Sequence, residues 1–166
     1  MHFPAYFLTW TTYGTWLHGD VRGSVNQTQN APGSLFLPPD HNQVAYFSQK
    51  QAAAQFLLSD EMRPIVDQSI RDHSLRRIWQ LLALNVRTNH VHLIVNCADS
   101  YTPEIVMQQL KSWATRRLIA ADLVRRGARI WTDHGSTRYL NDHPSLERAV
   151  NYVLHGQYEL PRIKVH

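Results

Sequence analysis

The chain has 166 residues, 43% of them apolar and 18% charged, which is enough to fold around a core as one domain over residues 1–166. Its single cysteine, Cys97, excludes a disulfide framework and a cysteine-based zinc site, and favours a reducing cytoplasm. The sequence has no apolar run long enough for a membrane span and no secretory signal pattern at its start. We therefore expect a cytoplasmic protein without a membrane partner.

Charge is distributed unevenly along the sequence. Residues 1–110 contain 7 Lys or Arg and 8 Asp or Glu, whereas residues 111–166 contain 10 basic and 5 acidic residues. A basic C-terminal third predicts a polyanionic partner such as nucleic acid, although a solvated helix face can have the same composition.

The first predicted elements are a strand, a long loop and a helix. Residues 5–13 are aromatic and β-branched, which predicts a strand. Glycine and proline interrupt every period from about 14 to 45, which predicts a long loop. Residues 48–58 are expected to form a short helix or an extended segment. Ser59 is then expected to cap a helix that continues to about Asp72.

Two strands joined by a hairpin are predicted next. Residues 76–87 favour a strand, with a helix as the alternative because of their leucines. Residues 89–97 alternate in polarity, so their side chains are expected to point to opposite faces. One face comprises Val91, Leu93 and Val95, and the other comprises His90, His92 and Ile94.

The C-terminal part predicts two helices and short extended pieces. Thr102 is a good N-cap for a helix that is expected to end at Gly127. Short extended segments over 129–132 and 137–140 precede a last helix over 143–155. This order of elements predicts an α+β fold, a ferredoxin-like sandwich in which helices pack on an antiparallel sheet.

His90 and His92 are the first candidate functional residues. Residues two apart on a strand point to the same face, so both imidazoles can bind one divalent ion if a third ligand comes from elsewhere. The alternative is a pair of polar side chains on the solvent face of a strand.

Tyr152 is the second candidate, on the last predicted helix. It lies off the apolar side of that helix, with Arg148 four residues before it and His155 three residues after it. A cation nearby would favour the phenolate, and tyrosine can form covalent intermediates. The alternative is a partly exposed packing residue. The apolar side itself is expected to comprise Leu146, Ala149, Val150, Val153 and Leu154.

Together these residues resemble the HUH single-tyrosine transposases of insertion sequences, and more closely the REP-associated tyrosine transposases. The resemblance covers most of the chain and preserves the order of the motifs. The matching segments are TWTTYGTWLHGDVRGS (9–24), TNHVHLIV (88–95), LKSWATRRL (110–118), WTDHGSTRYL (131–140) and ERAVNYVLHGQ (147–157).

The resemblance implies metal-dependent cleavage and strand transfer of single-stranded, hairpin-forming DNA. His90 and His92 would bind Mg²⁺ or Mn²⁺, and Tyr152 would attack the phosphate to leave a 5′-phosphotyrosine and a free 3′-OH. Relatives commonly place a third ligand, Gln or Asn, four residues after the tyrosine. That position is Gly156 here, so Gln157 is the expected ligand and His155 its substitute. Imidazole ligands favour Mn²⁺ over Mg²⁺.

The basic residues expected to contact DNA are Lys111, Arg116, Arg117, Arg125 and Arg148, with Arg126 on the same predicted helix as the first four. Relatives include monomers and dimers, so a homodimer is also expected as a possible assembly. Tyr158 is the competing nucleophile. The other functions left open are a relaxase or replication-initiation nicking domain, and a non-catalytic nucleic-acid binder that stacks bases on Trp79 and Phe7.

Overall fold

The computed structural model describes residues 4–15, 55–98 and 100–156. Its elements confirm the predicted α+β sandwich, and no helix within these ranges is long and apolar enough to cross a membrane. In chain order they are β1 (Ala5–Thr11), α2 (Met62–Arg76), β2 (Gln80–Val86), β3 (His90–Asn96), α3 (Pro103–Ala120), β4 (Ser136–Leu140) and α4 (His143–Leu154).

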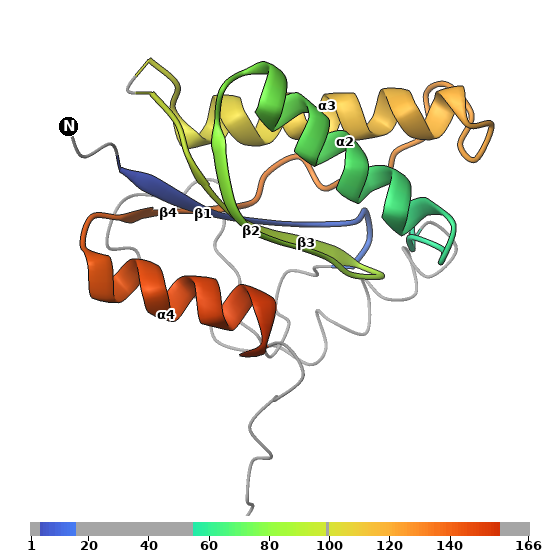
Figure 1. Ribbon diagram of the computed structural model, residues 1–166. Coiled ribbons are helices and arrows are strands. Elements are labelled where there is room, and N and C mark those ends of the chain that lie inside the picture. Colours follow the sequence, from blue (N-terminus) through green and yellow to red (C-terminus); the bar gives the residue numbers. More distant parts are fainter. Residues whose placement is uncertain (1–3, 16–54, 99, 157–166) are drawn as a thin grey trace, which may run out of the picture.

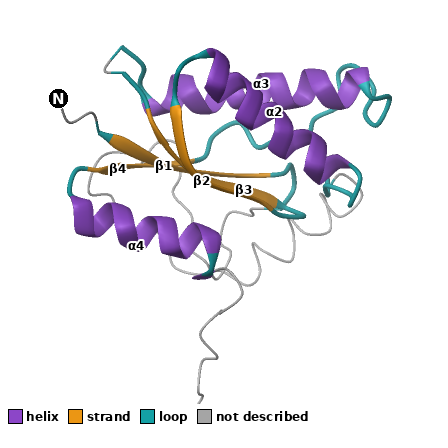
Figure 2. Ribbon diagram, in the orientation of Figure 1, coloured by secondary structure: helices purple, strands orange, loops and turns teal. Residues whose placement is uncertain are grey.

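The sheet is antiparallel, with strand order β2-β3-β1-β4. The first and third strands are therefore central, as in a ferredoxin-like sandwich. Helices α2 and α3 cover one face of the sheet, and α4 covers the opposite face (Figures 1 and 2). The two faces thus have different helices, and among the described residues α4 is the helix that covers the second face (Figure 1).

The alternating pattern of β3 decides which side chains meet which helices. Val91, Leu93 and Val95 are fully buried in the core on the α2–α3 side. Ile94 is buried on the other side, in a smaller cluster with Ala149 and Val153 of α4. His90 and His92 are half-buried on this α4 side, as predicted.

The boundaries of α2 differ slightly from the prediction. Helix α2 begins at Met62, and its N-cap position is Glu61, not the predicted Ser59. Ser59 instead closes the turn before the helix, where its backbone carbonyl and its hydroxyl both accept from the N–H of Met62, at 3.1 and 3.2 Å. The helix continues beyond its predicted end at Asp72 to Arg76, which was predicted to begin the next strand. Residues 55–58 are not helical, and the rest of the 48–58 segment and most of the 14–45 loop lie outside the described residues.

The predicted end of α3 is wrong. Thr102 caps its start, accepting from the N–H of Ile105 at 3.4 Å, but the helix ends at Ala120 and not near Gly127. Asp122 takes a left-handed conformation (φ 58°), and the N–H of Leu123 bonds back to the carbonyl of Leu118 at 3.1 Å. This closes a Schellman turn. Gly127 (φ 81°) belongs to a later turn.

Arg125 and Arg126 therefore do not lie on the same helix as Lys111, as the sequence led us to expect. Both are exposed in the turn that follows α3.

Candidate active site

A row of three register partners lies across the sheet at the α4 side. His92 of β3 pairs with Thr9 of β1 and with Asn85 of β2. Thr9 Oγ1 lies 2.6 Å from His92 Nδ1, and Asn89 Oδ1 lies 2.7 Å from His90 Nδ1. Each imidazole is thus oriented through its Nδ1 by a neighbouring polar side chain.

The two imidazoles are close enough to act on one ligand. Their ring centroids are 4.6 Å apart, with an interplanar angle of 69°. Burial, followed by the nearby His90 and Arg87, lowers the pKa of His92 to about 4. His92 is therefore neutral at neutral pH and can offer a nitrogen lone pair.

This donor set fits a divalent metal ion. Histidines that bind metals typically hydrogen-bond through the nitrogen that does not face the metal, as the Nδ1 atoms do here. The described residues include no third His, Cys, Asp or Glu close enough to complete the group. His155 is exposed just beyond α4 and does not complete it, and Gln157 lies outside the described residues.

Helix α4 brings Tyr152 next to the histidines. The ring centroid of Tyr152 is 5.8 Å from that of His92 and 6.1 Å from that of Phe7, and Phe7 in turn is 5.8 Å from His92. Tyr152 is 46% exposed, because the side of its helix next to it, with Ala149 and Val153, is the one that is buried. Of the apolar residues predicted for that side, Leu154 is exposed instead.

Two contacts fix the end of α4. Asn85 Nδ2 donates to the carbonyl of Val153 at 3.1 Å, which ties the helix to β2 one residue after Tyr152. Gly156 packs against the tyrosine ring so closely that a Cβ there would lie 3.0 Å from Tyr152 Cδ2. Nothing in the local sequence pattern marks Thr9 or Asn85, because their roles depend on strand order and register. Asn89 contacts the next residue in the chain, His90, so its role is local.

The predicted DNA-binding residues separate into two groups. Arg148 is exposed on α4, and donates to Ser145 Oγ at 3.2 Å. Arg116 and Arg117 are on α3, on the other side of the sheet (Figure 1). Arg117 pairs with Asp72 at 2.7 Å, and Arg116 lies over the ring of Trp113 at 4.9 Å.

Lys111 is buried, which contradicts its predicted contact with DNA. Only 5% of it is exposed, and its Nζ donates to the carbonyls of Thr132 and His134 at 2.8 and 3.2 Å. Burial lowers the pKa of Lys111 to about 8, although Asp133 opposes the shift. From the sequence alone, a lysine on an amphipathic helix is expected to be exposed to solvent. Lys111 is buried because residues 132–134 pack against α3 and cover it.

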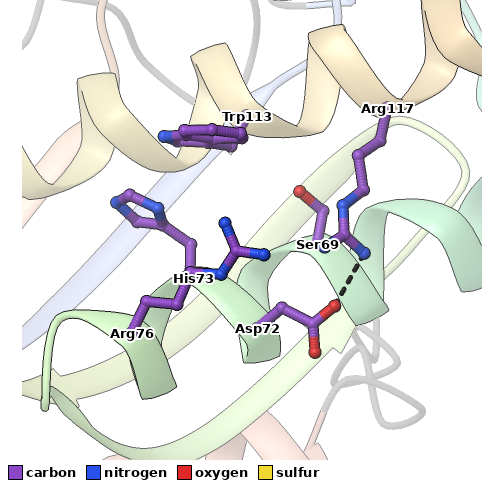
Figure 3. Close-up of a pocket in the computed structure, with 6 residues that line it drawn as sticks. All are labelled: Ser69, Asp72, His73, Arg76, Trp113 and Arg117. Atoms are coloured by element: carbon purple, nitrogen blue, oxygen red, sulfur yellow. Dashed lines mark ion pairs between the residues drawn. The ribbon is translucent and has the colours of Figure 1, made fainter.

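A small crevice lies between α2 and α3, away from these residues (Figure 3). His73 stacks on Trp113 there and its Nε2 lies 2.9 Å from Gln109 Oε1. The free volume is about 10 Å³, room for one water molecule and no substrate. Trp79, expected to stack bases in a non-catalytic binder, is buried in the core and so unavailable for that use.

Comparison with known proteins identifies a matching family. Residues 51–155 match the family described as "Transposase IS200 like". The matched segment includes His90, His92 and Tyr152, and it spans more than half of the chain. No curated protein is similar enough to this chain to count as a match.

Two solved structures are similar to this chain. A structure described as a REP-associated tyrosine transposase bound to a REP hairpin has a TM-score of 0.48 and 11% identity, covering 92% of this chain and 67% of that chain. A candidate transposase from Deinococcus radiodurans R1 has a TM-score of 0.52 and 17% identity, covering 95% of this chain and 92% of that chain. At this identity the second similarity supports the fold alone.

Proposed function

Because this chain belongs to the IS200-like transposase family, an enzyme family of DNA transposition, we propose that it cleaves and rejoins single-stranded DNA through a covalent bond to Tyr152. The observation that carries the proposal is the convergence of Tyr152, His90 and His92 on one face of the sheet. Tyrosine can act as a covalent nucleophile, and here an exposed phenol lies beside two imidazoles that can hold a metal ion.

The chemistry assigned to Tyr152 is a reversible transesterification. Its phenol oxygen attacks the phosphorus, and the bond from phosphorus to the 3′-oxygen breaks. The phenol proton passes to solvent, and the leaving 3′-oxygen takes one up as a free 3′-OH. In strand transfer a 3′-OH attacks the phosphotyrosine and releases Tyr152, so no bond energy is spent overall. The 46% exposure of Tyr152 leaves a path for a DNA strand to reach it.

His90 and His92 would hold the divalent ion, Mg²⁺ or Mn²⁺, with Gln157 as third ligand. When bound, such an ion supplies positive charge beside the scissile phosphate and stabilises its transition state. Asn89 Oδ1 is an acceptor, so its contact favours the tautomer of His90 with the proton on Nδ1, and the Thr9 hydroxyl orients the ring of His92. The lowered pKa of His92 prevents a proton from competing with the ion.

The proposed substrate is single-stranded DNA that forms a hairpin. Arg148 lies one helical turn before Tyr152 and is the exposed cation best placed near the reacting strand. Arg116, Arg117 and Arg125 lie on or beyond α3, so any contact they make with DNA is away from the cleaved phosphate.

A covalent-adduct assay tests the proposal. Single-stranded hairpin DNA labelled at its 3′ end is incubated with the protein and Mn²⁺, and the products are separated on a denaturing gel. The wild type and Tyr158→Phe are expected to form a labelled adduct, and Tyr152→Phe to bind DNA without forming one. An adduct that persists in Tyr152→Phe and disappears in Tyr158→Phe would overturn the assignment.

The histidines are tested with the same substrate. His90→Ala and His92→Ala are expected to abolish cleavage while the far-ultraviolet circular dichroism spectrum stays that of the wild type, since both side chains are only half-buried. Normal cleavage by the double variant in a chelating buffer would exclude a metal role for both residues.

A further inference from the structure

The C-terminal end of α2 presents an unusual surface, which we call the α2 tip (residues 75–78). All four residues are exposed, between the buried Ser74 and Trp79. Ile78 is 92% exposed and Leu75 is 79% exposed, the highest values among the large apolar side chains of the described residues. Arg76 and Arg77 lie between them. The tip therefore combines two apolar side chains with two guanidinium groups in solvent.

Ile78 also has a strained backbone. Its φ is 59°, in the left-handed region that favours glycine and is a genuine outlier for a β-branched residue. The N–H of Ile78 bonds to the carbonyl of Leu75 at 3.1 Å, and that of Trp79 to the carbonyl of Ser74 at 2.8 Å, so Ile78 occupies the glycine position of a Schellman turn. Packing does not explain an isoleucine there, because its side chain contacts mainly solvent.

The charge around the tip favours an anionic partner. Neither Arg76 nor Arg77 forms an ion pair with a described residue. Asp72, the acidic residue nearest to Arg76 along α2, is already paired with Arg117, as Figure 3 shows. Arg76 shares the crevice with Trp113, and Arg116 lies over that ring on α3, so cations and apolar surface continue onto the next helix.

We propose that the α2 tip is a second DNA contact, in which Arg76 and Arg77 bind backbone phosphates and Ile78, with Leu75, packs against an exposed base step of a hairpin. In many DNA-binding proteins, arginine and lysine side chains bind backbone phosphates, and apolar side chains insert between neighbouring base pairs. The inference rests on the proposed function. It gives the strained isoleucine a role that a glycine could not perform.

The position of the tip defines which DNA it reaches. It precedes Gln80, whereas the catalytic row crosses β2 at Asn85, five residues further along the strand. At ~3.3 Å per residue this is about 17 Å, the length of about five stacked base pairs. The tip also lies on the α2–α3 side of the sheet, away from Tyr152 (Figure 1). It therefore contacts the hairpin and not the scissile phosphate.

Two substitutions of Ile78 separate binding from folding. Ile78→Gly and Ile78→Asn are made in a Tyr152→Phe background, and hairpin-DNA affinity is measured in chelating buffer so that no cleavage occurs. Both are expected to weaken binding about tenfold through loss of an apolar contact. Ile78→Gly should at the same time raise the midpoint of thermal unfolding by about 2 °C, because glycine relieves the left-handed strain.

Asp122→Gly is the matched control. Asp122 has φ 58° and occupies the same position in the turn that ends α3. The substitution relieves left-handed strain without removing an apolar side chain. Because it also removes one negative charge, it should leave DNA affinity unchanged or raise it slightly, and it should not weaken binding. Arg76→Gln and Arg77→Gln should each reduce the slope of log affinity against log salt by about 0.9.

The outcomes are distinct. If the Tyr152→Phe parent fails to bind hairpin DNA, the proposed function fails along with the inference. If the parent binds and Ile78→Asn binds equally well with an unchanged salt slope, only the inference is overturned. It is also overturned if sedimentation analysis shows that the parent is a dimer and Ile78→Asn a monomer, while DNA affinity is unchanged. The tip would then be a contact between two copies of the chain.

Discussion

Thr9 Oγ1 lies 2.6 Å from His92 Nδ1 across the β1–β3 pair, so a hydroxyl on the first strand orients the imidazole on the third. In metal sites such a partner holds the orientation of the ring. Its loss typically weakens metal binding by about 10- to 100-fold.

We therefore expect Thr9→Val to weaken Mn²⁺ binding by about 10- to 100-fold, measured by isothermal titration of the protein without DNA. Thr9→Ser, which retains the hydroxyl, should bind nearly as well as the wild type. Equal affinity in the wild type and Thr9→Val would mean that Thr9 plays no part in the site.

Asn85 holds the helix that carries Tyr152. Its Nδ2 donates to the carbonyl of Val153, so Asn85→Asp removes the donor while keeping the shape of the side chain. We expect a loss of about 1 kcal/mol in the free energy of unfolding, a slower single-turnover cleavage and an unchanged DNA affinity. Asn151→Asp adds the same charge at an exposed position of α4 and should leave the cleavage rate as it is.

Gly156 limits the space beside the tyrosine ring. A Cβ at this position would lie 3.0 Å from Tyr152 Cδ2, so Gly156→Ala must shift the ring by a few tenths of an ångström. We expect the covalent adduct to form more slowly, because orientation of a nucleophile contributes strongly to rate, and hairpin-DNA affinity to stay the same.

Gly127→Ala is the control for that variant. Gly127 has φ 81° and nothing within 4 Å of a Cβ, so alanine there strains the backbone without touching the site. It should lower stability and leave the rate of adduct formation unchanged. Similar rates for the two alanine variants would show that contact with Tyr152 does not matter.

Lys111 predicts a pH-dependent stability. Burial lowers its pKa to about 8 in the folded protein from 10.5. Between these values unfolding takes up a proton, so the contribution of Lys111 to the free energy of unfolding rises with pH and is lost as pH falls through 8. Relative to Lys111→Met, the wild type should gain at most about 3 kcal/mol from pH 8 to 10.5.

Urea unfolding of the two proteins at several pH values measures this difference. Burial raises the pKa of Cys97 to about 12, which acts in the opposite direction, but Cys97 is present in both proteins and cancels in the comparison. A constant difference across this range would mean that Lys111 is not desolvated in the folded state.

The sequence by itself determined the elements and much of the site. Alternation over residues 89–97 is a local property, and it alone places His90 and His92 on the face opposite Val91 and Leu93. The N-cap at Thr102 and the apolar side of the last helix are likewise local, because each depends on residues that are close together in the sequence. Tyr152 was identified as exposed for this reason.

Tertiary structure decided what depends on contacts between distant segments. The roles of Thr9 and Asn85 follow from the β2-β3-β1 register, and the burial of Lys111 follows from residues 132–134 packing on α3. The arginines of α3 and α4 lie on opposite faces because the sheet separates those helices. Local pattern cannot encode these features, since strand order and register are set by burial over the whole chain.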